Sequence, residues 1–173
     1  LRQQEIDQAR EQLKKAAELK PTSPEIETML ALVESRAGNL AEAVRHWARV
    51  LELRPADARA AFALARDTER QGRPEDDAAA QRALEALLAR HDNIAVRLEL
   101  ARIAAKRGDA DTLSKAIAPL TQAASRWAPQ AQQQLQAVLD SIANPRAAAT
   151  RVAFLKNYLV RDPEYRRAMS ELT

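Results

Sequence analysis

The sequence predicts an all-α protein built from stacked antiparallel pairs of helices. Alanine and leucine, two strong helix formers, together make up about one third of the 173 residues. Aromatic residues account for only 3% of the chain and glycine for three residues, which argues against a β-sandwich or a glycine-rich nucleotide fold. The three glycines, Gly38, Gly72 and Gly108, lie 34 and 36 residues apart, and Pro21 and Pro55 lie 34 apart. This spacing predicts a repeated unit of helix, tight turn and helix.

The composition also excludes several kinds of site. The chain contains no cysteine, so it has no disulfide, no thiolate zinc site and no cysteine nucleophile. Its 27 basic and 24 acidic residues give a net charge of +3 and are interspersed, which is typical of solvated helix surfaces rather than of a nucleic-acid-binding face. No uncharged apolar segment is long enough to predict a membrane span.

The helices can be placed in order along the chain. A first helix runs up to Pro21, and pairs follow over 24–57, 58–92 and 94–127, with one helix of the second pair at Pro74–Arg90. Pro119 is expected to kink or delay the second helix of the third pair. Helices over Pro129–Ala143 and Arg146–Val160 come next, and a short last helix, capped by Asp162, is expected to end near Leu172.

One segment carries a family resemblance. The stretch Gly38–Pro55, GNLAEAVRHWARVLELRP, presents a small-aromatic-small face on a helix that a proline closes, and the preceding helix has the large-small pair Leu30 and Ala31. The face is formed by Ala43, Trp47 and Val50. This pattern resembles the tetratricopeptide (TPR) repeat family. The resemblance implies a right-handed α-solenoid, a TPR-like superhelix of stacked antiparallel helical pairs.

The resemblance also implies a domain organisation. Residues 1–21 match the second helix of an incomplete leading repeat, so the expectation is that its first helix is missing from this chain. Residues 24–57, 58–92 and 94–127 match about three repeats, and 129–173 form a degenerate helical pair with a C-terminal capping helix. The chain departs from the family at the large aromatic and tyrosine positions of the first helices. Those positions hold Glu27, Ala61 and Arg97, and Glu34, Thr68 and Ala104.

No catalytic, cofactor-binding or metal-binding constellation stands out. His46 and His91 are each isolated from a second histidine at ligand spacing. The acid pairs Asp76–Asp77 and Asp109–Asp111 fall at helix starts, where carboxylates cap free amides. Enzyme function is therefore not supported, and no cofactor is expected.

The TPR resemblance further implies a concave groove lined by one stripe of each first helix. Six of the fifteen stripe positions are basic and two are acidic. The candidate partner-binding residues on this stripe are Arg36, Arg59, Phe62, Arg66, Arg70, Leu98, Arg102 and Lys106. The other stripe positions are Glu25, Thr28, Leu32, Ser35, Glu69, Ala95 and Ala105. Such a groove would suit a peptide that carries carboxylates, which pair with the cations, and hydrophobic side chains, which contact Phe62 and Leu98. An ordinary solvated charged face remains the alternative interpretation.

A second candidate surface lies near the C-terminus. Six large apolar or aromatic residues gather there, and they either cap the stack or dock another segment. They are Val152, Phe154, Leu155, Tyr158, Leu159 and Tyr165. The run RVAFLKNYLVRDPEYRRAMSEL also resembles segments that follow such repeats in exported bacterial proteins, which favours a bacterial, extracytoplasmic (periplasmic) location.

Two functions of different classes follow from the sequence. The first is a non-catalytic protein–protein interaction scaffold whose basic groove binds an acidic or amphipathic peptide segment of a protein partner. The second is a structural spacer or self-assembly module within a larger protein, in which case the chain self-associates or fills its own grooves. Nucleic-acid binding is poorly supported, because stacking aromatics and a dense basic stripe are both lacking.

Overall fold

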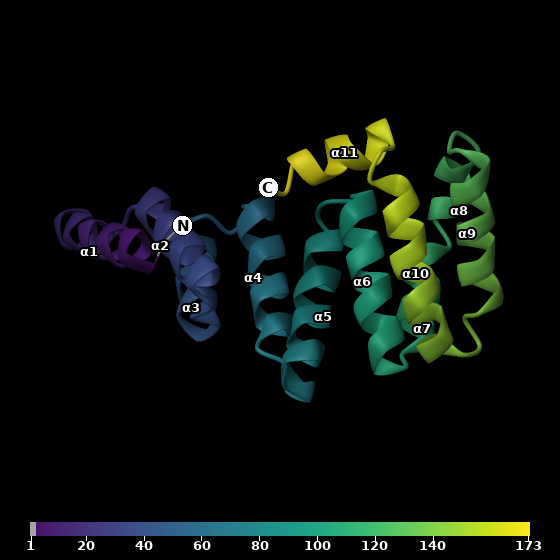
Figure 1. Cartoon of the computed structure of the whole chain (residues 1–173), viewed down its shortest axis with the longest axis horizontal. Coiled ribbons are helices and arrows are strands. Elements are labelled where there is room, and N and C mark those ends of the chain that lie inside the picture. Colours follow the sequence, from purple (N-terminus) through teal and green to yellow (C-terminus); the bar gives the residue numbers. More distant parts are fainter. Residues whose placement is uncertain (1–2) are drawn as a thin grey trace. The chain divides into compact units, whose positions relative to one another are not determined.

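The computed structural model describes residues 3–173, and the first two residues of the predicted segment 1–21 lie outside the described part. Every regular element within 3–173 is a helix (Figure 1). The helices are α1 (Gln3–Leu19), α2 (Pro24–Ala37), α3 (Leu40–Leu53), α4 (Ala58–Arg70), α5 (Pro74–Leu88), α6 (Ile94–Arg107), α7 (Ala110–Ile117), α8 (Leu120–Ala124), α9 (Pro129–Asp140), α10 (Pro145–Leu159) and α11 (Pro163–Ser170). The all-α prediction is therefore confirmed, and consecutive helices pack against each other as in a helical-repeat protein.

Turn chemistry ends and begins these helices at the predicted places. Gly38 and Gly108 follow α2 and α6 with φ angles of 83° and 78°, a left-handed conformation that glycine adopts without a Cβ penalty. Pro119 falls between α7 and α8, so the expected interruption is confirmed. The Asp162 carboxylate accepts the backbone N–H groups of Glu164 and Tyr165 and caps α11 as predicted.

The chain divides into two compact units, Leu1–Ala83 and Leu84–Thr173, with the boundary inside α5. In the described part of the first unit, α1 packs on α2, α2 on α3 and α3 on α4. The core between α2, α3 and α4 is made mostly of small side chains around one indole. It contains Ala31, Ala43, Trp47, Val50 and Ala60, with Leu51, Ala63 and Leu64 packed against it. Small residues at the crossings let the helix axes approach closely, and Trp47 fills the remaining space.

The second unit shows a packing relationship that the sequence did not indicate. Its helices α6, α7, α8, α9 and α10 contact one another in order, and α10 then returns to pack against α6. This closes a ring of helix contacts instead of leaving α9 and α10 as a further sequential layer. Helix α11 also packs on α6. The core of this ring is aliphatic and includes Val96, Leu98, Ile103, Leu113, Ile117, Val138, Val152, Leu155 and Leu159.

The six C-terminal apolar residues divide into two groups. Val152, Leu155, Leu159 and Tyr165 are buried, so they form core and cap contacts. Phe154 and Tyr158 are about half exposed, at 52% and 49%. The interpretation as cap and core packing therefore holds for the four buried residues, and docking stays a prediction for Phe154 and Tyr158.

Candidate protein-interaction surface

The eight predicted partner-binding residues fall in different units. Arg36 of α2 and four residues of α4 belong to the first unit, and three residues of α6 belong to the second. The four on α4 are Arg59, Phe62, Arg66 and Arg70, and the three on α6 are Leu98, Arg102 and Lys106. Each unit therefore has to be considered as a surface of its own.

Helix α4 exposes only arginines. Arg59, Arg66 and Arg70 are its exposed residues, and their spacing of seven and four places them on one side of a helix with 3.6 residues per turn. The three guanidinium groups extend over about 16 Å of helix axis. Arg66 also lies over the ring of Phe62, at 5.9 Å from the ring centroid. The exposed residues of α4 are thus all basic.

Helix α2 exposes apolar surface in the same unit. Its exposed residues are Glu25, Met29, Leu32 and Arg36, and their spacing of four, three and four again defines one side of the helix. Met29 is 53% exposed and Leu32 is 42% exposed. Leu32 belongs to the predicted stripe, whereas Met29 was missed, although its spacing from Leu32 is a signal that could have found it.

Hydrogen bonds join the two helices at their C-terminal ends. Arg70 Nη1 donates to Ser35 Oγ at 2.9 Å, and Ser35 Oγ donates to the carboxylate of Asp67 at 2.9 Å. Arg70 also donates to Asp67 at 2.7 Å. The C-terminal ends of α2 and α4 therefore adjoin one another within the first unit. We call the residues Met29, Leu32, Arg36, Arg59, Arg66 and Arg70 the basic–apolar face.

The prediction that Phe62 and Leu98 make apolar contacts with a partner is wrong. Phe62 is only 3% exposed and Leu98 is fully enclosed, so neither side chain presents apolar surface to a partner. Repeat spacing places a residue on one side of a helix but does not reveal how deeply neighbouring helices cover it. Met29 and Leu32 take their place as exposed apolar residues.

The predicted cations of α6 have a different environment. Arg102 is half-buried and donates from Nε and Nη2 to Oε1 of Glu99, at 3.1 and 2.7 Å. Lys156 of α10 donates to the other oxygen of Glu99 at 3.1 Å. Burial opposes the charge of Glu99, but Arg102 and Lys156 outweigh it, so the pKa of this carboxyl lies below its ordinary value. Glu99 therefore joins α6 to α10 through Lys156, Arg102 bonds the same carboxylate from within α6, and Lys106 is the exposed cation of this group.

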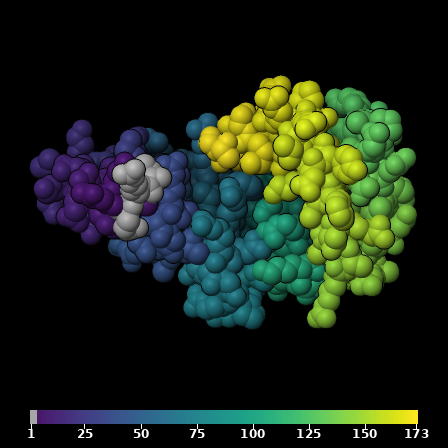
Figure 2. All heavy atoms as spheres, in the orientation of Figure 1, coloured from purple at the N-terminus to yellow at the C-terminus, as the bar shows by residue number. Residues whose placement is uncertain are grey.

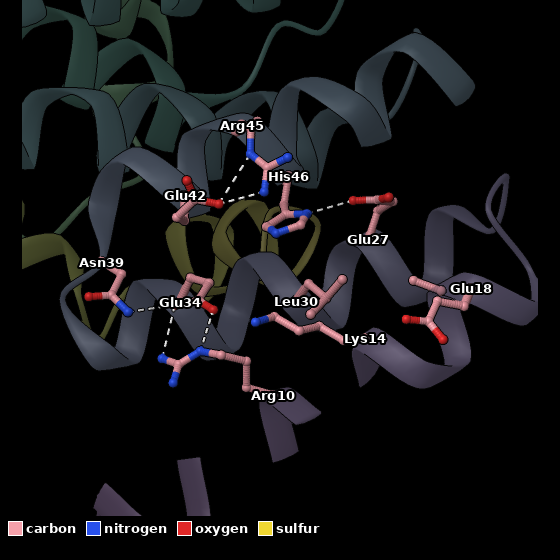
Figure 3. A pocket seen from close by; sticks show the side chains of 11 residues that line it. Arg10, Lys14, Glu18, Glu27, Leu30, Glu34, Asn39, Glu42, Arg45 and His46 are labelled. Carbon is pink, nitrogen blue, oxygen red and sulfur yellow. Dashed lines mark hydrogen bonds and ion pairs between the residues drawn. The ribbon is translucent and has the colours of Figure 1, made fainter. Parts of the chain in front are cut away.

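A cleft of about 600 Å³ lies between α1, α2 and α3 (Figure 3). Figure 3 shows Leu30 among charged side chains of both signs. Its charged and polar lining residues are Arg10, Lys14, Glu18, Glu27, Glu34, Asn39, Glu42, Arg45 and His46. Most of these groups bond one another, and the three basic and four acidic side chains nearly balance, so the cleft has little charge with which to select an ionic ligand.

The strongest contact in this cleft involves Glu34, at the position where the TPR pattern has a tyrosine. Arg10 donates to both Glu34 oxygens, at 2.6 and 3.1 Å, and Asn39 donates at 2.7 Å. The hydrogen bonds from Arg10 hold the pKa of the Glu34 carboxyl below its ordinary value, although burial opposes them. The Glu34 carboxylate thus ties α1 to α2.

Each of the two histidines lies close to one carboxylate. His46 Nδ1 lies 2.7 Å from Oε2 of Glu27, and both side chains are largely buried. His91 Nε2 lies 3.4 Å from Oε2 of Glu171. Within residues 3–173 no group of three or more His, Asp or Glu side chains is arranged to hold a metal ion.

No family model matches this chain, and no curated protein matches it. In the described part, none of the helices has the length and apolar character needed to cross a bilayer.

Proposed function

We propose that this protein is a non-catalytic, TPR-type interaction scaffold whose basic–apolar face binds an acidic, amphipathic segment of a protein partner. The observation that carries the proposal is the composition of the exposed sides of α2 and α4. All exposed residues of α4 are arginines, and α2, which is bonded to α4 at its C-terminal end, presents Met29 and Leu32 on its exposed side. The charges attract carboxylates, and the apolar side chains gain from burial against a partner.

The arrangement also suggests how such a segment would lie. The three arginines of α4 are spread along about 16 Å of axis, which matches the length of a short bound peptide. Carboxylates along one side of the peptide would meet Arg59, Arg66 and Arg70. Aliphatic side chains on its other side would contact Met29 and Leu32 of α2. Arg36, at the end of α2, adds a fourth cation.

The test uses a defined probe and the full chain. A fluorescein-labelled peptide of roughly 16 residues, with leucines on one side and glutamates on the other, is titrated and its anisotropy is followed. We expect saturable binding that weakens as NaCl rises from about 0.05 M to about 0.5 M, because salt screens exposed charges. A peptide with glutamine in place of every glutamate should bind more weakly.

Matched variants locate the site. The Arg59→Glu/Arg66→Glu variant should weaken binding by about tenfold or more, since it reverses two charges on the basic–apolar face. Arg70 is left unchanged because it bonds the buried Asp67. The control, Arg45→Glu/Arg82→Glu, reverses two exposed arginines of the same unit on α3 and α5. Equal losses in both variants, or no binding by the unaltered chain, would overturn the proposal and favour the spacer function.

A further inference from the structure

Two rows of residues run along α10 at the same spacing, and only one of them is buried in the core of the second unit. Ala148, Val152, Leu155 and Leu159 have the spacing four, three, four, and all are buried in the second unit. The stripe one residue earlier has the same spacing and is exposed. It consists of Ala147, Arg151, Phe154 and Tyr158. We call this second set the α10 outer stripe.

The outer stripe lines a groove. A cavity of about 590 Å³ is bounded by all four of its residues together with Thr150 and Gln134, the latter from α9. Phe154 and Tyr158 are 52% and 49% exposed, although aromatic side chains of this size are mostly buried in folded proteins. Figure 2 shows α10, in yellow-green, lying at the surface along its length on the face in view.

The spacing of this stripe indicates a helix as the occupant. Residues that recur every four, three and four positions form the seam along which one helix packs against another. Phe154 and Tyr158 are one turn apart, about 6 Å along the axis, and they leave room for side chains that a facing helix presents at the same interval. Ala147, at the start of the stripe, is small enough to allow close approach.

The charges around the stripe indicate an acidic occupant. Residues 147–161 contain no acid and three cations, Arg151, Lys156 and Arg161, and the single acid of α9 is Asp140. Asp140 accepts a hydrogen bond from Gln136 at 2.7 Å, and Lys156 bonds Glu99 on another side of α10. Arg151 lies within the stripe itself and adjoins the aromatic pair. A carboxylate on the facing helix would pair with it.

Two other occupants fit less well. A second copy packed through the same stripe would place Arg151 near its symmetry mate, and like charges in an isologous contact repel. Single-stranded nucleic acid can stack on aromatic side chains, but it also needs a run of cations along the groove, and only Arg151 lines this one.

We propose that the α10 outer stripe is a second docking site, independent of the basic–apolar face, that binds an acidic amphipathic helix of a protein partner. Phe154 and Tyr158 receive the partner's aliphatic side chains, and Arg151 pairs with a carboxylate beside them.

The test is made in the Arg59→Glu/Arg66→Glu background, so that the first proposed site does not contribute. The probe is a lactam-stapled, fluorescein-labelled helix of roughly 16 residues with leucines at four-three-four spacing and flanking glutamates. We expect saturable binding to the full chain. Phe154→Ala/Tyr158→Ala and Arg151→Glu should each weaken it by about tenfold or more. The control, Arg146→Glu, makes the same charge change on the same helix outside the stripe and should change affinity by less than about twofold.

Each contrary result has a definite meaning. Absence of binding in this background, or equal weakening by Arg146→Glu and Arg151→Glu, would overturn the proposed site and leave the first proposal untouched. Sedimentation that shows a concentration-dependent dimer, abolished by Phe154→Ala, would assign the stripe to a second copy instead. Binding of a labelled oligo(dT) that is lost in Phe154→Ala/Tyr158→Ala would assign it to nucleic acid. Circular dichroism spectra that match the unaltered chain establish that each variant is folded.

Discussion

Trp47 of α3 donates its indole N–H to Asp67 of α4 at 3.0 Å, and both residues are almost completely buried. The other oxygen of Asp67 accepts from Ser35 of α2 and from Arg70 of α4, at 2.9 and 2.7 Å. One carboxylate therefore joins three helices of the first unit. A buried charge is tolerated only where hydrogen bonds replace its hydration, and these three donors do so.

Removal of this carboxylate should destabilise the first unit strongly. Asp67→Ala leaves the Trp47 N–H buried without an acceptor and removes the carboxylate partner of Arg70, so we expect the free energy of unfolding to fall by about 2–4 kcal/mol. Trp47→Phe removes a single donor and should cost less in hydrogen bonding. Urea unfolding followed by circular dichroism measures the change. Glu52→Ala, which removes an exposed carboxylate from α3, is the control, and a loss as large in Glu52→Ala would contradict the role assigned to Asp67.

The ion pair between Arg10 and Glu34 should make stability depend on acidic pH. Because Arg10 holds the pKa of Glu34 below its unfolded value of 4.5, the pair stabilises the folded state above that value and loses its effect as pH falls through the folded pKa. The difference in free energy of unfolding between the unaltered chain and Glu34→Gln should therefore be largest near neutral pH and shrink on acidification.

Urea midpoints collected across that pH range test this prediction. Glu42→Gln, which alters an exposed carboxylate of the same cleft, should show a much smaller difference at every pH. A difference for Glu34→Gln that stays constant from neutral to acidic pH would show that the carboxylate contributes by packing rather than by its charge.

The Asn93 side chain both caps α6 and bonds α11, and different substitutions can separate these two roles. Its Oδ1 accepts the backbone N–H groups of Ala95 and Val96 and caps α6, while Nδ2 donates to the carbonyl of Ala168 in α11 at 3.0 Å. Asn93→Asp keeps the cap but replaces the donor with a charge that faces the Ala168 carbonyl and Glu171. We expect faster amide hydrogen exchange in α11 with α6 little changed, whereas Asn93→Ala should affect both helices and cost about 1–3 kcal/mol. Unchanged exchange in α11 for both variants would contradict this coupling.

The surroundings of Gly108 have space for a side chain, but its backbone conformation is unfavourable for any residue other than glycine. A Cβ at this position would have no neighbour within 4 Å, yet the φ angle of 78° lies in the left-handed region. Gly108→Ala should therefore lower the free energy of unfolding by about 1–2 kcal/mol through backbone strain alone. Gly108→Asn should recover part of the loss, because asparagine tolerates this conformation better. Thermal unfolding measures both, and equal losses for alanine and asparagine would indicate a different cause.

Local features of the structure could be predicted from the sequence because interactions between residues close in the chain determine them. The Gly38 turn, the interruption at Pro119 and the Asp162 cap depend on the conformation or hydrogen bonding of a few neighbouring residues. The buried side of α3 was likewise predictable, since Ala43, Trp47 and Val50 repeat at helical spacing. The basic character of the α4 surface also followed from its arginines.

Contacts between residues distant in the sequence could not be predicted from local patterns. Glu34, Asp67 and Glu99 resemble surface acids in the sequence, yet each is buried with a cation supplied by its own or another helix. The burial of Leu98 depends on the packing around α6, which includes the return of α10.

The sequence by itself determined that the chain is helical, where most helices begin and end, and which side of each helix is apolar. Propensity, capping and periodicity act over a few residues, so they are encoded locally. Only the tertiary structure decided that Phe154 and Tyr158 of α10 are half exposed while Leu155 and Leu159 are buried, because that depends on whether another helix covers them. The same reason explains why Leu32 is exposed and Phe62 is not.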